Sequence, residues 1–309
     1  MIHTKTNNFD VYTIISNDGS TQASFVPEKG GVGSSIIMPF NHEKRELLFQ
    51  HTHFWERDNP HLPGGWPFLF PICARIERNN IAGNYLYDGH LYNLPIHGFA
   101  PYLPWEVTSH AADNLTLKLC SNSKTLAVYP FHFCVELKYQ VTNSILTCSQ
   151  TYRNTGNKPL PYYAGFHPYF LTPPFNHGKE KVKVNFNASR HFKYNEKLTD
   201  LVGEQELLKL PATITDSALN EQLNMLSKNK IVTLTYPDGL KINIEAQGVE
   251  DSDLFNYLQM YTQPQEPFIC LEPWMSFPNA LNTVAGVRWL KPQTKEHGLL
   301  KLWIEKISN

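Results

Sequence analysis

Four side chains with acid, base or cationic chemistry stand in segments that are otherwise apolar or aromatic: Arg75, His97, His167 and Glu272. Imidazole titrates near neutral pH, so a histidine can give or take a proton under working conditions. A carboxylate can accept a proton from a hydroxyl group, and a guanidinium can hold the oxygens of a ligand. Brought together in one cleft, these groups could open and reclose the ring of a cyclic hemiacetal.

That reaction needs one base, one acid and hydrogen-bond anchors. The base removes the proton of the anomeric hydroxyl while a protonated imidazole donates a proton to the ring oxygen, and the free aldehyde forms. Rotation about the C1–C2 bond followed by reclosure inverts the anomeric centre. Each positioned acid or base contributes on the order of 10²–10⁴-fold. We therefore expect neither a metal nor a cofactor, and a cyclic sugar as the substrate; the resemblance described below implies a hexose.

Each of these residues also has an ordinary structural interpretation. A histidine among aromatic residues is commonly a packed core residue, and a glutamate before a Pro-Trp pair is commonly a capping or surface residue. A lone arginine in an apolar run either pairs internally or reaches a ligand oxygen. A glycosidase would use two carboxylates. The sequence offers only one well-placed carboxylate, Glu272, with a histidine partner, so a glycosidase is disfavoured.

The scaffold that must position these residues is predicted to be all-β, a large and mostly antiparallel β-sandwich. Alternating apolar and polar residues predict many strands joined by short turns. The clearest are residues 9–15, 22–26, 34–38, 115–119, 133–139, 145–152, 231–236, 240–246, 256–262 and 298–305. Asp88-Gly89 and Asp238-Gly239 are turn signals between strands. A short helix is expected at residues 216–226.

Composition sets the remaining expectations. The chain has 309 residues, a formal net charge of −1 and 13% aromatic residues, which predicts one domain over residues 1–309 that binds neither nucleic acid nor membrane. The amino-terminal residues lack the apolar core of a signal peptide, so a cytoplasmic protein is expected.

The five scattered cysteines, with no C-x-x-C pair, predict free thiols. His51 and His53 form only a weak metal signal.

Four segments, taken in order, resemble the aldose 1-epimerase (galactose mutarotase-like) family. They are Ala74-Arg75-Ile76, residues 97–100 (His-Gly-Phe-Ala), residues 165–170 (Gly-Phe-His-Pro-Tyr-Phe) and residues 270–274 (Cys-Leu-Glu-Pro-Trp). A Pro-Ile-x-x-Arg segment before the His-Gly-Phe segment is similar to the bacterial LacX-like subgroup. The resemblance implies an aldose 1-epimerase on a large β-sandwich.

Carried over by motif, the resemblance implies that Glu272 is the general base and His167 the general acid. His97 and Arg75 would bind sugar hydroxyls. The family also has a substrate-binding aspartate between the second histidine and the glutamate, and Asp216 is the best match.

Two departures leave alternatives open. Ala74 stands where galactose-type members have asparagine, which puts the preference for galactose over glucose in question. Pro101 stands where hexose-6-phosphate epimerases often have arginine, although Arg57 and Arg78 could supply charge to a phosphate. A hexose-6-phosphate 1-epimerase and a non-catalytic carbohydrate-binding protein are the alternatives. A monomer or a homodimer is expected.

Overall fold

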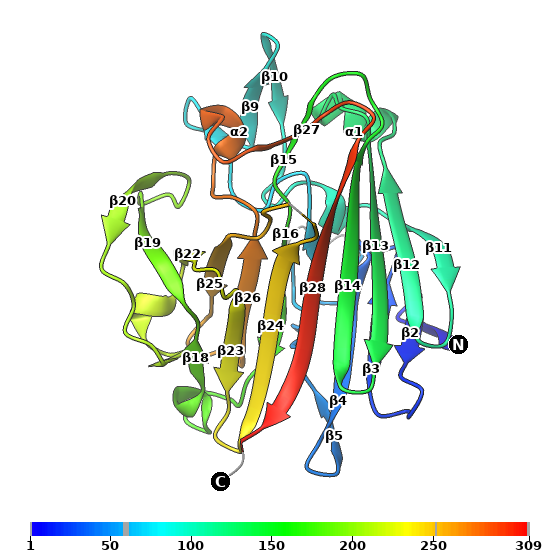
Figure 1. The fold of residues 1–309 in the computed structure, drawn as a ribbon, viewed down its shortest axis with the longest axis vertical. Helices are drawn as coiled ribbons and strands as arrows, with labels where there is room; N and C mark the ends of the chain where they lie inside the picture. The colour runs from blue at the N-terminus through cyan, green and yellow to red at the C-terminus, as the bar shows by residue number, and fades with distance from the viewer. Residues whose placement is uncertain (1, 58–61, 251, 308–309) are drawn as a thin grey trace.

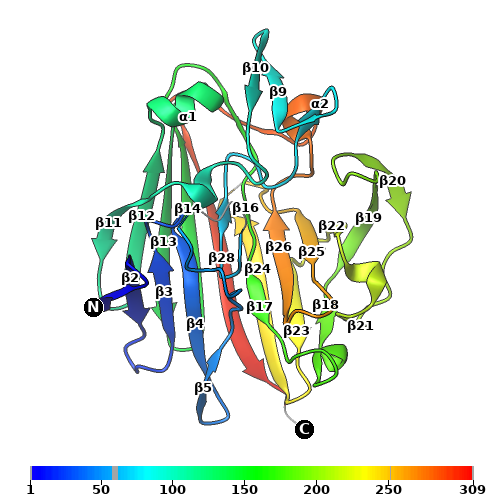
Figure 2. The same cartoon turned by 180° about the vertical axis from the view of Figure 1, so that it is seen from behind.

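A computed structural model describes residues 2–57, 62–250 and 252–307 of the chain. It is built almost entirely of antiparallel strands, which confirms the predicted all-β sandwich. Figure 1 shows the longest strands side by side, and Figure 2 shows the strands that cover them from behind.

In the part of the chain that the structure describes, three larger sheets form the layers. The amino-terminal sheet has the order β1-β2-β3-β4-β5, with bounds β1 Ile2–Thr6, β2 Phe9–Ile15, β3 Gln22–Val26, β4 Val32–Phe40 and β5 Glu43–Glu46. The second sheet has the order β11-β12-β13-β14-β28-β24-β23-β18-β21. Its bounds are β11 Glu106–His110, β12 Asn114–Cys120, β13 Phe133–Thr142, β14 Ile145–Asn154, β28 Lys295–Lys306, β24 Leu240–Gly248, β23 Ile231–Thr235, β18 Lys183–Asn185 and β21 Ala212–Thr213.

The third sheet carries Glu272 in one of its strands and His167 in the link between two others. Its order is β20-β19-β22-β25-β26-β16-β6, and β17 pairs with β26 as well. The bounds are β20 Leu201–Gln205, β19 Ala188–Tyr194, β22 Gln222–Leu226, β25 Tyr257–Tyr261, β26 Phe268–Trp274, β16 Gly165–Phe166, β6 Phe68–Leu69 and β17 Tyr169–Leu171.

Short elements complete the described chain. Two-stranded pairs are β7 Glu77–Arg78 with β8 Ile81–Ala82, β9 Asn84–Tyr87 with β10 His90–Asn93, and β15 Leu160–Tyr162 with β27 Arg288–Leu290. The helices are α1 Ser123–Val128 and α2 Ala280–Thr283, with 3₁₀ turns at Ala100–Tyr102, Lys179–Lys181 and Ser217–Leu219. The hairpin β9–β10 turns at Asp88-Gly89, as predicted, and projects from one end of the molecule beside α2 (Figure 1).

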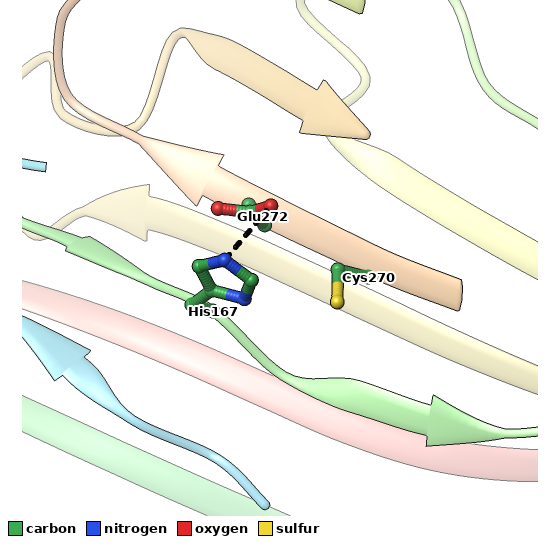
Figure 3. A group of neighbouring side chains, drawn as sticks. All are labelled: His167, Cys270 and Glu272. Carbon is green, nitrogen blue, oxygen red and sulfur yellow. Dashed lines mark ion pairs between the residues drawn. The ribbon is translucent and has the colours of Figure 1, made fainter. Parts of the chain in front are cut away.

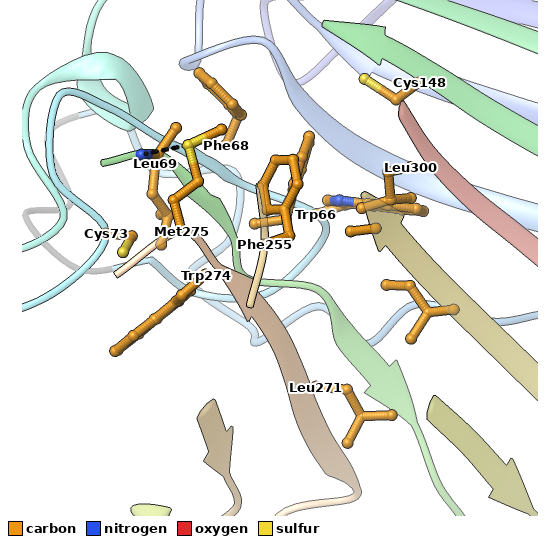
Figure 4. Packing of buried hydrophobic residues seen from close by; sticks show 14 of the residues in the cluster. Trp66, Phe68, Leu69, Cys73, Cys148, Phe255, Leu271, Trp274, Met275 and Leu300 are labelled. Atoms are coloured by element: carbon orange, nitrogen blue, oxygen red, sulfur yellow. Dashed lines mark hydrogen bonds between the residues drawn. The ribbon is translucent and has the colours of Figure 1, made fainter. Parts of the chain in front are cut away.

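The core lies between the sheets, where large aromatic residues fill the space. Trp66, Phe68, Phe255 and Leu271 pack closely there (Figure 4), and all four are buried. One cluster of buried apolar residues takes members from Ile14 to Leu302. The organisation as a single domain stays a prediction.

Two expectations from the sequence are wrong. Residues 216–226 form a 3₁₀ turn and strand β22 instead of a helix, because Gln222 to Leu226 pair with both β19 and β25. Cys120 and Cys134 form a disulfide, so they are not free thiols. These two residues stand directly opposite each other across β12 and β13, with Cα atoms 4.0 Å apart, a register that their spacing of 14 does not reveal. Cys73, Cys148 and Cys270 are free and buried.

Candidate active site

Strand β26 positions Glu272 through its simple alternation of faces. Successive side chains of a strand point to opposite sides, so Cys270, Glu272 and Trp274 share one face. Glu272 and Trp274 border a cavity on that face, while Leu271, on the other face, packs in the main core. Glu272 stands opposite Gln259 of β25 in the strand register, and Gln259 borders the same cavity.

His167 lies between the short strands β16 and β17, which pair on either side with β26. Gly165 stands opposite Trp274, and Tyr169 stands opposite Cys270. The backbone N–H of His167 donates to the carbonyl of Pro67 at 3.0 Å, and its ring stacks on Tyr169 at 4.8 Å between centroids. The sequence places His167 and Glu272 more than one hundred residues apart, yet this pairing holds them together.

The central contact of the cavity joins the imidazole and the carboxylate. His167 Nε2 lies 3.3 Å from Glu272 Oε1 (Figure 3). The two residues are 6% and 1% exposed. Their second polar atoms, His167 Nδ1 and Glu272 Oε2, have no hydrogen-bond partner among the described residues. Buried polar atoms are normally paired, so the two missing partners set this pair apart from ordinary core residues.

Burial disfavours both charged forms of this pair. It raises the pKa of Glu272 well above 4.5, and the negative charge of Glu221 adds to the effect. It lowers the pKa of His167 well below 6.5, with a further contribution from His97. Burial therefore favours the arrangement in which Glu272 is a neutral carboxylic acid and His167 a neutral imidazole. Perturbed acids and bases of this kind gather at functional sites.

His97 approaches the pair from a loop with a left-handed backbone. His97 has a φ of 65° and Gly98 a φ of 73°. The Nδ1 atom of His97 lies 3.0 Å from the carbonyl of Cys73, and because a carbonyl can only accept, Nδ1 carries the proton. The Nε2 atom of neutral His97 is thus an acceptor. Burial lowers the pKa of His97 to about 4, and its ring lies 5.3 Å from that of His167, nearly perpendicular to it.

Arg75 and Glu221 also border this cavity, and they form a long ion pair. Arg75 Nη2 lies 4.0 Å from Glu221 Oε1, and the Arg75 side chain is 40% exposed. The other carboxylate oxygen, Glu221 Oε2, accepts from Gln259 Nε2 at 3.0 Å. Tyr194 in turn donates its hydroxyl to Gln259 Oε1 at 2.8 Å. This chain of contacts fixes the orientation of the Glu221 carboxylate and leaves one of its oxygens toward Arg75.

Asp216 is the one predicted site residue that is not brought to the cavity. It precedes the 3₁₀ turn Ser217–Leu219, and its carboxylate accepts from the backbone N–H of Ala218 at 2.9 Å. Glu221, five residues further along, borders the cavity instead. The backbone of Glu221 is left-handed, with a φ of 53°, and no sequence pattern predicts this conformation. Glu221, Gln259 and Tyr194 escaped the sequence argument because no motif marks them.

Cys270 brings a third group with metal-binding chemistry close to the pair. Ligand atoms of His167, Cys270 and Glu272 lie within 4.8 Å of one another (Figure 3). Cysteine binds metals as the thiolate. Burial, followed by the charges of Glu272 and Glu221, raises the pKa of Cys270 well above 9.0, so the thiol is retained. His53 Nδ1 pairs with Glu56 at 2.5 Å, and its ring stacks on His51.

The cavity has a volume of about 530 Å³ and is bordered by both aromatic and polar side chains. A cleft with mostly apolar walls and a few convergent polar groups is typical of small-molecule sites. Within the three described ranges, no helix is long and apolar enough to cross a membrane.

A β-sandwich that presents a buried carboxylate–imidazole pair in a small-molecule cleft belongs with the mutarotase-like proteins. The chain is a member of the aldose 1-epimerase family, whose model matches residues 10–294. Family membership supports a role as a sugar epimerase or mutarotase. It also confirms the resemblance drawn from the four sequence segments.

Individual relatives agree with this assignment. The chromosomal LacX protein of Lactococcus lactis subsp. lactis is 24% identical over 241 residues, which cover 74% of this chain and 79% of LacX. The solved structure of the Slr1438 protein from Synechocystis superposes with a TM-score of 0.80 at 24% identity, covering 99% of this chain and all of that one. Galactose 1-epimerase from Lactobacillus acidophilus superposes with a TM-score of 0.72 at 14% identity, covering 100% and 98%. These structures share the fold.

Proposed function

We propose that the protein is an aldose 1-epimerase that interconverts the α and β anomers of a free hexose. The observation that carries the proposal is the 3.3 Å contact between His167 Nε2 and Glu272 Oε1 at the edge of the cavity. The anomeric hydroxyl and the ring oxygen of a pyranose are bonded to the same carbon. An acid and a base that act on these two oxygens must therefore lie close together, as these two atoms do.

In the proposed mechanism, the pair holds one proton before the ring opens and one proton after it has opened. The proton lies on His167 when the reaction begins, and the short separation from Glu272 allows it to move there from the carboxyl group. Glu272 takes the proton of the anomeric hydroxyl, and its electrons form the C1=O bond. The bond from C1 to the ring oxygen breaks, and His167 donates its proton to that oxygen. The pair again holds one proton, now on Glu272.

Reclosure reverses these steps on the other face of the aldehyde. After rotation about C1–C2, the ring oxygen attacks C1, His167 takes back the proton of that hydroxyl, and Glu272 returns its proton to the carbonyl oxygen. Atoms and protons balance without any other reactant. Because the pair is buried, the charges that develop on it interact more strongly than they would in water.

The remaining polar groups are proposed to hold the sugar. His97 Nε2 is free to accept a hydrogen bond from a hydroxyl, since its Nδ1 donates to Cys73. Arg75 can donate and Glu221 can accept, and their 4.0 Å gap leaves room for a sugar hydroxyl to bridge them. We therefore propose Glu221, and not Asp216, as the acidic residue that binds the sugar. Asp216 does not border the cavity, and its role in substrate binding stays a prediction.

A phosphorylated hexose has less support. A phosphate dianion needs several cationic or N–H partners. Among the described residues that border the cavity, Arg75 is the only arginine or lysine, and it faces Glu221. Arg57 lies against the ring of Phe9 and 3.9 Å from Glu28, and Arg78 belongs to strand β7, so neither borders the cavity.

Polarimetry of freshly dissolved α-D-glucose, α-D-galactose and glucose 6-phosphate tests the proposal, with the uncatalysed rate subtracted. We expect faster equilibration of at least one free hexose than of glucose 6-phosphate. Acceleration of the phosphate alone would replace the proposal with a hexose-6-phosphate 1-epimerase. If none of the three is accelerated while a sugar binds in a titration, the protein is a carbohydrate-binding protein.

A further inference from the structure

A third side chain lies beside the pair of His167 and Glu272 and has no part in the proposed reaction. Cys270 and Glu272 are two positions apart on strand β26, so both project from the same face of the strand. Ligand atoms of Cys270, Glu272 and His167 lie within 4.8 Å of one another (Figure 3). Cys270 is fully buried and its thiol is free. A sulfur, an oxygen and a nitrogen donor therefore meet at one point of the molecule.

These three donors are the ones that zinc binds in proteins, often with three protein ligands and one open position. Zn–S bonds are about 2.3 Å long and Zn–N and Zn–O bonds about 2.0 Å, so the ligand atoms of one tetrahedral zinc lie about 3.3–3.5 Å apart. The 3.3 Å between His167 Nε2 and Glu272 Oε1 already matches this separation. Because no separation within the group exceeds 4.8 Å, the sulfur of Cys270 needs to approach by only about 1 Å.

The surroundings of the three donors favour a cation. His167 Nδ1 and Glu272 Oε2 are buried and have no hydrogen-bond partner among the described residues, which is unusual for buried polar atoms. Both residues border the cavity, so an ion can reach them from solvent. In the part of the chain that the structure describes, two carboxylates, Glu221 and Glu272, and one guanidinium, Arg75, border that cavity. When both carboxylates are ionised, the charge of the wall is negative and attracts a cation.

A bound divalent cation also removes the charge that burial opposes. Without a cation, burial keeps the Cys270 thiol protonated, but the charge of a coordinated metal deprotonates a thiol. Binding therefore releases the thiol proton of Cys270 and the carboxyl proton of Glu272 to solvent. The resulting thiolate and carboxylate balance the two positive charges of the metal, and His167 adds a neutral nitrogen. The complex carries no net charge, so its burial avoids the cost of burying an uncompensated ion.

We propose that Cys270, Glu272 and His167 form a binding site for a divalent cation of the Zn²⁺ type, and that the bound cation inhibits the protein. Once both residues of the pair are bonded to a metal, neither can exchange a proton with a sugar. The cation is thus an inhibitor and not a cofactor. Cation binding is independent of the proposed epimerase function, whereas the inhibition rests on it.

Titration with Co²⁺ tests the site directly, because a thiolate bonded to Co²⁺ gives a charge-transfer absorption in the near ultraviolet. His51 and His53 also border the cavity, but imidazoles alone do not give this band. We expect the band in the wild-type protein and in Cys148→Ala, which truncates another fully buried free cysteine, on β14. Cys270→Ala should abolish the band and weaken Zn²⁺ binding, measured by competition with a chelating dye, at least about tenfold.

A second measurement follows mutarotation of the preferred hexose at increasing Zn²⁺, with the rate in the same Zn²⁺ without protein subtracted. Zn²⁺ should inhibit the wild-type and Cys148→Ala proteins, and a chelator should restore their activity. Cys270→Ala should need at least about tenfold more Zn²⁺ for the same inhibition. Full activity of the wild-type protein in saturating Zn²⁺ would overturn the inhibition.

The cobalt band separates the cation site from the epimerase function. Its absence from the wild-type protein in excess Co²⁺ would overturn the site, and so would an unchanged band in a folded Cys270→Ala variant. If no sugar is turned over, the epimerase proposal fails, and the band alone decides the site in the same way. If Cys270→Ala does not fold, Cys270→Ser takes its place, because a hydroxyl group does not give the band either.

Discussion

His167 Nε2 and Glu272 Oε1 lie 3.3 Å apart, although His167 stands in the short link between β16 and β17 and Glu272 in strand β26. Both side chains are buried, and each keeps a second polar atom without a partner among the described residues. Hydrogen-bonded strands on either side fix this relationship, since β16 and β17 both pair with β26. The contact is thus a property of the sheet and does not depend on a flexible loop.

Because one proton serves both residues, they should behave as a unit in a double-mutant cycle. Glu272→Gln and His167→Asn are each expected to lower kcat by about 10²–10⁴-fold. The double variant should lose little more than the worse single variant, because neither residue completes the reaction without the other. Progress curves of hexose mutarotation measure these rates. Losses that multiply in the double variant would show that the two residues act independently.

The pH dependence of activity should reflect a pair that holds one proton. A second proton inactivates the pair by binding to the base, and burial holds the pKa of His167 well below 6.5, so the acidic loss should begin below that pH. The single proton leaves only as the pH rises past the pKa of Glu272, which burial and Glu221 hold well above 4.5. We therefore expect the alkaline loss of kcat/KM to follow the raised pKa of Glu272 and to respond to the charge of Glu221.

A profile of kcat/KM from about pH 4 to 9 provides the measurement, after subtraction of the uncatalysed rate. Glu221→Gln should move the alkaline limb to lower pH, because it removes a negative charge that raises the pKa of Glu272. An alkaline limb at the ordinary pKa of a histidine, unchanged by Glu221→Gln, would be at odds with a shared proton.

The choice between Glu221 and Asp216 as the acidic sugar-binding residue can be made with two matched variants. Glu221→Gln is expected to raise KM about tenfold to a hundredfold, since a hydrogen bond to a charged group contributes about 1.5–3 kcal/mol. Asp216→Asn should change KM less than twofold, because the Asp216 carboxylate is occupied by the N–H of Ala218. Steady-state kinetics with the preferred hexose give both values. The opposite ranking would restore Asp216 to the binding site.

The loop that carries His97 depends on a close backbone approach at Gly98. A Cβ atom there would collide with the carbonyl of Phe70, which accepts from the backbone N–H groups of Phe99 and Ala100. Gly98→Ala should lower the free energy of unfolding by more than about 1 kcal/mol and reduce activity through displacement of His97.

Gly89→Ala is the matched control for this prediction. Gly89 has a φ of 77°, close to the 73° of Gly98, but a Cβ added there would meet nothing within 4 Å. The two variants share the backbone cost of a left-handed alanine, and their difference in urea unfolding isolates the collision. Equal destabilisation, with full activity in both, would show that the close approach at Gly98 is unimportant.

Local sequence patterns were sufficient to predict most of the long strands, and the roles of the site residues stay predictions. The alternation of apolar and polar residues predicted β2, β3, β12 to β14, β23 to β25 and β28. A half-buried strand has one apolar and one polar face, so its residues alternate along the sequence. The ordered motifs around Arg75, His97, His167 and Glu272 also predicted a common site, and all four residues border one cavity.

What the sequence could not supply were relationships between strands. Cys120 and Cys134 meet only because of the register of β12 and β13, and register is set by contacts along the whole pair. Residues 216–226 look helical in isolation but pair with β19 and β25. Glu221 borders the cavity because the backbone turns there in a left-handed conformation, whereas Asp216 was chosen by motif similarity alone.

The most direct test of the account is the anomerisation rate of freshly dissolved α-D-glucose and α-D-galactose with wild-type protein and with Glu272→Gln. Glu136→Gln, an exposed change on β13, is the control. We predict that the wild-type and control proteins accelerate equilibration of at least one sugar. Glu272→Gln should bind that sugar in a titration but fail to accelerate it. A Glu272→Gln variant with wild-type activity would contradict the assignment of Glu272 as the base that opens the ring.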